Sequence, residues 1–300
     1  METSLDGPAI ALSLLTVGIL LASGILWYLN VSPTKQPLAT DTVSEPPENW
    51  QIGWVNFGLL ICAAVISIAV VQLGLIALLG LSGDIPDLTV EPEEIKLSPT
   101  LALFSILSIQ APLFAVFYLF RRCMPEDFGG PLNSTRLNLF QSFRAGLIAF
   151  LRYVPIIWAS AIIWSSFLQL LSRFGLVQSP PPQELITALQ TSDDLVTIAL
   201  ICIGAVIIAP IVEEIFFRGA VYRFFKSKLS LYSAQLISGI IFSLIHQNLS
   251  VLVSLTIAGM CFAHAYERSG SLLVAMWFHS LFNLFALLSV LLIGLSEVSI

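Results

Sequence analysis

Two adjacent glutamates and an arginine stand inside one of the most apolar stretches of the chain, "IVEEIFFRG" at 211–219. Residues four apart share a helix face, so Glu214 and Arg218 can pair directly. Glu213 points about 100° away on the same helix and finds no partner there. An unpaired carboxylate in an apolar site is a candidate general base. We therefore expect Glu214 and Arg218 to support the structure and Glu213 to do chemistry.

Two further polar pairs follow, each spaced by one helical turn. Phe242 and His246 frame "FSLIH", and His279 and Asn283 frame "HSLFN". Side chains of the His and Asn types can both donate hydrogen bonds to a developing oxyanion. Either pair alone is a weak signal, because His and Asn also hold transmembrane helices together. The remaining histidine, His264, fits no pattern, and we interpret it as a packing or interfacial residue.

The elements that must position these residues are membrane helices. Of the 300 residues 57% are hydrophobic and only 11% are charged, whereas a soluble domain carries about a quarter charged residues. The sequence predicts an all-α, polytopic membrane helix bundle of about eight transmembrane helices in a lipid bilayer. The expected spans are 8–30, 52–82, 99–120, 142–172, 195–217, 231–247, 249–266 and 271–295.

The chain divides at about residue 190. Residues 1–190 are predicted to form N-terminal transmembrane helices and loops, and 191–295 a catalytic core that contains every polar pair described above. The proline-rich stretch 31–49 is interpreted as an extended linker, and "SPPPQEL" at 179–185 as a stiff polar break before the fifth helix. The net charge is −6 and no basic patch is large enough for nucleic acid. The four scattered cysteines form no pair typical of a disulfide framework or a zinc site.

Basic residues in short loops predict the orientation. Arg121, Arg122 and Arg136 share one loop, Arg218 to Lys228 another, and Arg268 marks a third. These loops are expected in the cytoplasm, with both termini outside. The protein is then an integral, multi-pass membrane protein whose active site is accessible from the cytoplasmic side.

The three ordered motifs, "EEIFFR", "FSLIH" and "HSLFN", resemble those of the CPBP intramembrane proteases, which include type II CAAX prenyl endopeptidases and bacteriocin-processing, Abi-like proteins. The resemblance covers about residues 195–290. It implies that Glu213 and His246 activate a water and that His279 and Asn283 hold the oxyanion. It also assigns Glu214 and Arg218 to supporting positions. The implied function is an intramembrane endopeptidase acting on a membrane-associated protein, such as a prenylated CAAX-type substrate or a leader peptide.

Alternatives use the same residues. Glu213, His246 and His279 could supply a His₂Glu zinc site with one position free. We favour a reaction without a metal or other cofactor, because Asn283 suits an oxyanion site better than a zinc shell. A non-catalytic membrane scaffold or immunity protein is a further reading. A transporter is disfavoured by the lack of internal repeats, and the string contains neither GxSxG nor HExxH.

One geometric difficulty arises from the predicted spans. If the fifth helix ended at residue 217, Glu213 would lie near the cytoplasmic face. His246 would then lie some 16 residues along the next helix, about 24 Å from that face. The two must meet if they share a water. We therefore expect the fifth helix to run on past Arg218, with "FFKSKLSLYS" forming the turn at the surface.

Overall fold

The computed structural model describes residues 7–31, 46–48, 50–82, 98–177, 192 and 194–298. Every regular element in these residues is a helix, which confirms the predicted all-α class. The elements are α1 (Gly7–Val31), α2 (Trp54–Ser82), α3 (Pro99–Cys123), α4 (Pro125–Phe128), α5 (Leu139–Arg173), α7 (Leu195–Ile203), η2 (Gly204–Ile208), α8 (Ala209–Phe216), η3 (Phe217–Tyr222), α9 (Arg223–Lys226), α10 (Leu231–Leu244), η4 (Leu249–Val251), α11 (Leu252–Ser269) and α12 (Leu272–Val298).

Seven helices within the described residues are long and apolar enough to cross a membrane, close to the eight that were expected. Large apolar side chains such as Leu73 and Leu81 of α2 are exposed on their outer faces, which suits a lipid environment. The protein is an integral, multi-pass membrane protein. Of the linker expected at 31–49, only residues 31 and 46–48 are described. The polar break expected at 179–185 lies outside the described residues.

Local sequence signals set several helix ends. The Ser98 side chain caps α3 by accepting the Leu101 N–H, and Pro99 occupies the first turn. Asn138 and Gln141 form a reciprocal capping box at the start of α5. Gly270 closes α11 with a left-handed backbone, φ 61°, which glycine adopts without steric cost.

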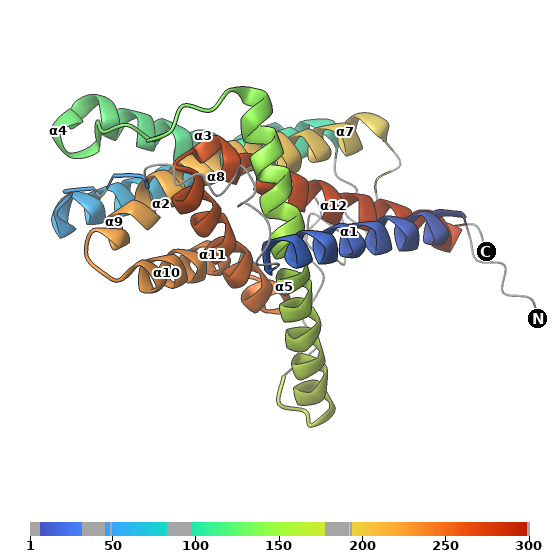
Figure 1. Ribbon diagram of the computed structural model, residues 1–300. Helices are drawn as coiled ribbons and strands as arrows, with labels where there is room; N and C mark the ends of the chain where they lie inside the picture. Colours follow the sequence, from blue (N-terminus) through green and yellow to red (C-terminus); the bar gives the residue numbers. More distant parts are fainter. Residues whose placement is uncertain are drawn as a thin grey trace, which may run out of the picture.

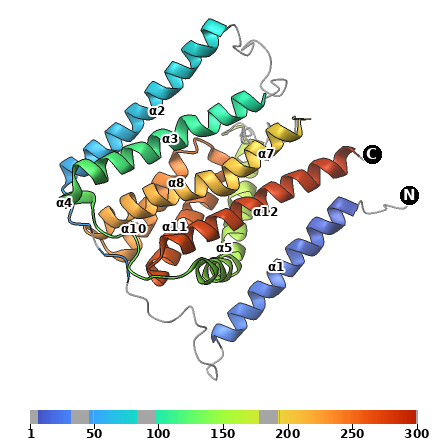
Figure 2. The same ribbon diagram turned by 90° about the horizontal axis from the view of Figure 1, so that it is seen from above.

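Most of the long helices run in a common direction, and α5 crosses them. α5 stands upright in Figure 1, where α1 and α12 lie nearly level, and it is seen close to end-on in Figure 2. It packs against α12, α11 and α1. Gly146 permits the close crossing, because a Cβ there would lie 2.5 Å from the Cβ of Trp277 on α12.

Several long helices other than α5 have their ends at two opposite sides of the bundle. The side where α3, α9 and α11 terminate carries Arg121, Arg122, Lys226, Lys228 and Arg268 and is called the basic end below. α4 marks this side, and the start of α1 and the end of α12 lie at the opposite side in Figures 1 and 2. Backbone hydrogen bonds from Ser134 and Thr135 to the Gly270 carbonyl tie the loop after α4 to the α11–α12 turn.

The helical run from Leu195 to Lys226 is continuous. This agrees with the expectation that the fifth helix continues past Arg218 and places Glu213 deeper in the bundle. The span predicted at 195–217 was therefore too short. Thirteen residues separate Glu213 from Lys226, which corresponds to a depth of about 20 Å. The turn at the surface lies at 227–230, within the stretch that the sequence suggested.

The next element, α10, is shorter than predicted. It has 14 residues instead of the 17 expected for 231–247, so it rises only about 21 Å. The chain then turns at Gln247, which has φ 49°, and α11 packs back along α10. Because α10 ends part-way, His246 stands at about the depth of Glu213.

Candidate active site

A cavity of about 440 Å³ lies between α3, α8, α10, α11 and α12. All four residues predicted to act on a substrate line it: Glu213, His246, His279 and Asn283. Their helices are far apart in the sequence, and the cavity is where those helices converge. The rest of its wall is mainly apolar, with Ile106, Ile109, Leu255, Leu287 and Val290 among its residues.

Glu213 is held by a residue from outside the motifs. The Gln110 side-chain amide of α3 donates a hydrogen bond to Glu213 Oε1 at 3.0 Å. Glu213 Oε2 lies 3.9 Å from His279 Nε2, and its side chain remains 12% exposed. One carboxylate oxygen is therefore fixed by the amide, while the other faces the imidazole.

Glu214 makes two contacts through a single oxygen. Its Oε1 accepts from Arg218 Nη1 at 2.7 Å and lies 2.9 Å from His279 Nδ1. Glu214 and Arg218 are both fully buried. Arg218 also donates to the Gly259 carbonyl at 2.9 Å. Glu214 thus neutralises a buried guanidinium and orients the His279 ring.

Two phenylalanine rings, those of Phe242 and Phe262, pack against the Arg218 guanidinium. The Arg218 guanidinium lies 4.7 Å from the ring centre of Phe242 and 5.1 Å from that of Phe262, a cation–π arrangement. Phe262 also stacks on His279, with ring centres 4.6 Å apart and planes 19° from parallel. These aromatic rings hold Arg218 and His279 in place.

His246 is oriented by its own helix. Its Nδ1 lies 2.8 Å from the Phe242 carbonyl. A carbonyl only accepts, so Nδ1 carries the hydrogen, and the neutral ring presents Nε2 as an acceptor.

Asn283 has a backbone partner in a widened helical turn. η2 is a π-helix, in which the Ala209 N–H bonds to the Gly204 carbonyl five residues back. The same pattern would pair the Ala205 carbonyl with residue 210, but Pro210 has no N–H. Asn283 Nδ2 donates to that Ala205 carbonyl at 2.8 Å. Because the amide nitrogen carries two hydrogens, one is left for another acceptor.

Glu213, His246 and His279 are not arranged as a set of zinc ligands. In the described part of the chain, no group of three or more His, Cys, Asp or Glu side chains could hold a metal ion. His246 and His279 each contact a protein acceptor through Nδ1, a contact that histidines also make when Nε2 binds a metal. The described donor atoms give no positive support to the metalloprotease interpretation, and the reaction without a cofactor stays a prediction.

Gln110 and His264 were not among the predicted site residues. Sequence analysis missed Gln110, because a lone amide in an apolar helix carries no spacing signal. His264 does not line the cavity, and its ring packs edge-on to Tyr153 with centres 5.7 Å apart. That position agrees with a packing residue.

Comparison with known proteins bears on the same region. Residues 195–285 match the sequence model of a family described as type II CAAX prenyl endopeptidase Rce1-like. The matched range contains the predicted site from Glu213 to Asn283. The match supports the resemblance of residues 195–285 to the CPBP intramembrane proteases.

One bacterial relative matches part of the chain. A Bacillus subtilis (strain 168) protein named "Putative membrane peptidase YdiL" is 32% identical over 96 residues. The match covers 32% of this chain and 39% of that protein, so it spans well under two thirds of the relative's length. No solved structure matches the chain significantly. The division at residue 190 stays a prediction.

Proposed function

We propose that this protein is an intramembrane endopeptidase that hydrolyses a peptide bond of a membrane-associated protein. The observation that carries the proposal is the shared cavity of Glu213, His246, His279 and Asn283, with Glu213 held by Gln110. A carboxylate and an imidazole acceptor facing one apolar cavity are groups that can activate a water.

In the proposed reaction the water lies between Glu213 and His246. The free acceptor, Nε2 of His246, orients one O–H, and Glu213 takes the other proton as the water oxygen attacks the peptide carbonyl carbon. The C–N bond then breaks, and the proton held by Glu213 passes to the departing amine. The products are a new carboxyl group and a new amino group, so atoms and charge balance.

The oxyanion of the tetrahedral intermediate is assigned to His279 and Asn283. Nε2 of His279 can donate only when the ring carries both protons, and the Glu214 carboxylate at Nδ1 is the counter-charge for that form. Asn283 donates through its second amide hydrogen. Donors fixed in advance stabilise such charge effectively, because they do not have to reorganise during the reaction.

The lining of the cavity favours a substrate with an apolar group. Ile106 and Ile109 of α3 and Leu287 and Val290 of α12 form apolar wall in the same cavity as the catalytic groups. An apolar segment or a lipid chain beside the scissile bond would bury apolar surface there. We propose a prenylated CAAX-type protein or a leader peptide as the substrate class, with access from the cytoplasmic side.

Cleavage by purified protein in proteoliposomes tests the proposal. A prenylated CAAX peptide, its unprenylated form and a leader peptide are offered, and new termini are detected by mass spectrometry. We expect hydrolysis to persist after thorough chelation and to disappear in Glu213→Gln, which removes the base while leaving its shape. If the folded protein cleaves none of the three peptides, the proposed peptidase activity is contradicted. Loss of activity on chelation, with rescue by zinc, would contradict the metal-free reaction.

A further inference from the structure

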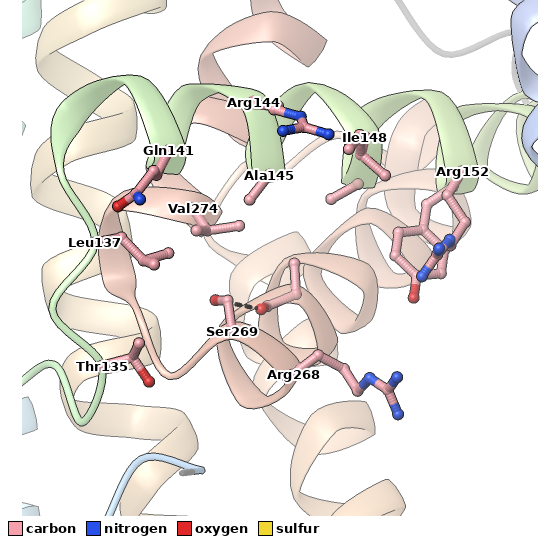
Figure 3. Close-up of a pocket in the computed structure, with 13 residues that line it drawn as sticks. Thr135, Leu137, Gln141, Arg144, Ala145, Ile148, Arg152, Arg268, Ser269 and Val274 are labelled. Atoms are coloured by element: carbon pink, nitrogen blue, oxygen red, sulfur yellow. Dashed lines mark hydrogen bonds between the residues drawn. The ribbon is translucent and has the colours of Figure 1, made fainter. Parts of the chain in front are cut away.

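A second cavity lies at the basic end, away from the catalytic cavity. Its volume is about 310 Å³, and it lies between the first half of α5, the last turn of α11 and the start of α12. No residue is common to the described linings of the two cavities. Figure 3 shows this second cavity between the α5 ribbon and the end of α11.

Three arginines line the cavity: Arg144 and Arg152 from α5 and Arg268 from α11. None of its described lining residues is acidic. Arg152 is half-buried, whereas Arg144 and Arg268 are exposed. Arg152 and Arg268 also interact with other groups of the chain. The three guanidinium groups nevertheless give one cavity an excess of positive charge.

The remaining lining is partly apolar and partly hydroxylic. Leu137, Ile148 and Val274 form apolar wall, and Thr135 and Ser269 add hydroxyl groups. In Figure 3 the Arg144 and Arg152 side chains extend from α5 and Arg268 from the facing helix end. A ligand that fits must combine a negative charge and hydrogen-bond acceptors with an apolar part.

The position of the cavity indicates which kind of anion it can bind. It stands where α11 ends and α12 begins, at the level of the turn closed by Gly270. Helix ends of a membrane bundle lie near the lipid headgroups, and arginine binds phosphate oxygens through a planar fork of donors. We propose that this cavity binds the phosphate headgroup of an anionic membrane lipid, whose glycerol and first acyl carbons contact the apolar wall.

The cavity is also connected to the active site by packed aromatic rings. Tyr153, which lines it, stacks on Phe278 with ring centres 6.0 Å apart. Phe278 packs edge-on to Phe262 at 4.7 Å, and Phe262 stacks on His279. A lipid bound in this cavity therefore contacts Tyr153, the first of the packed rings that lead to His279 on α12. The binding itself is independent of the proposed peptidase activity.

Thermal unfolding of the full-length protein in an uncharged detergent tests the proposal. Short-chain phosphatidylglycerol, short-chain phosphatidylcholine and inorganic phosphate are titrated separately, because a ligand that binds the folded state raises the melting temperature. We expect a saturable rise with phosphatidylglycerol and a much smaller one with the other two. An equal rise with inorganic phosphate, or no difference between the two lipids, would overturn the proposal.

Matched double variants separate this cavity from general surface charge. Arg144→Gln with Arg268→Gln removes two cavity charges, and Arg122→Gln with Arg136→Gln removes two exposed charges that do not line it. We expect the first pair to weaken phosphatidylglycerol binding on the order of tenfold or more, about 1.4 kcal/mol, and the second by under about twofold. Equal weakening by both pairs would refute the site. If the first pair lowers the lipid-free melting temperature, Arg144→Gln alone is compared with Arg122→Gln.

Discussion

At the scale of single residues, two adjacent glutamates have different partners. Glu213 faces the cavity with Gln110 and His279 beside it. Glu214 is fully buried between Arg218 and His279. We expected Glu214 to support only Arg218, and the structure adds the contact with His279. The supporting carboxylate therefore acts on the orientation of a proposed catalytic ring as well as on the fold.

Replacing Glu214 should damage the fold more than replacing Glu213. Glu214→Gln leaves the Arg218 charge buried without its carboxylate, a change that costs on the order of 3–5 kcal/mol. We expect poor accumulation and a lower melting temperature in detergent. Glu213→Gln is the matched control and should fold normally, since Glu213 keeps some exposure. Equal destabilisation of the two variants would contradict this division of roles.

Gln110 is expected to position the proposed base. A hydrogen bond to a charged group contributes about 1.5–3 kcal/mol, so Gln110→Ala should lower kcat roughly 10- to 100-fold with little change in KM. Ser108→Ala is the control, because Ser108 is also buried in α3 but does not line the cavity, and its hydroxyl bonds to the Ser105 carbonyl of its own helix. A Gln110 variant that loses melting temperature while kcat is unchanged would show a packing role only.

At the scale of elements, two irregular features bring the motifs together. The π-helical turn η2 precedes Pro210 and leaves the Ala205 carbonyl to Asn283. The short α10 forms a hairpin with α11 and ends beside the cavity. Gly239 and Gly259 allow this hairpin to close, since a Cβ on Gly259 would lie 2.8 Å from the Gly239 Cα.

The Gly259 contact predicts a sharp response to one methyl group. Gly259→Ala would also place its Cβ 3.3 Å from Arg218 Nη2, so α10 and α11 must separate and the Arg218 bond to the Gly259 carbonyl must lengthen. We expect a loss of about 1–3 kcal/mol, typical of overpacking, seen as a lower melting temperature. Gly58→Ala in α2, which meets nothing within 4 Å, should be neutral or gain up to about 1 kcal/mol. Similar melting temperatures for both variants would argue against the close hairpin.

At the scale of the whole molecule, the difference in charge between the basic end and the opposite end predicts an orientation in the membrane. Cationic loops favour the cytoplasmic side, and the proposed lipid cavity lies at that same end. Glu213 is about 20 Å from it along the helix. The proposed reaction therefore takes place inside the bundle, at a depth that an apolar substrate segment can reach from the bilayer.

Chemical labelling checks this direction. Cys123 is exposed at the end of α3, so with the other three cysteines replaced by alanine it should react with a membrane-impermeant maleimide only from the cytoplasmic side. Leu195→Cys in the same background marks the opposite end and is exposed as well; it should react only from outside. Labelling of Cys123 in right-side-out vesicles would reverse the predicted orientation.

The sequence by itself determined what depends on local composition and spacing. Long apolar runs specify membrane helices, because an unpaired backbone is too costly in lipid. Helix geometry pairs Glu214 with Arg218 at four residues' separation. The caps at Ser98 and Asn138 are local in the same sense, because each side chain bonds within the first turn of its own helix. The need for Glu213 and His246 to share a depth also predicted that the fifth helix continues past Arg218.

Only the tertiary structure decided which distant groups meet. The Gln110–Glu213 bond joins residues 103 apart in the chain, His279–Glu214 joins residues 65 apart, and Asn283–Ala205 joins residues 78 apart. No periodicity encodes such pairs, because they depend on how helices cross and how deep each one ends. The short α10 was decided in the same way. An apolar run looks alike whether its helix crosses the bundle or turns back beside a cavity, and packing against α11 determines which of the two occurs.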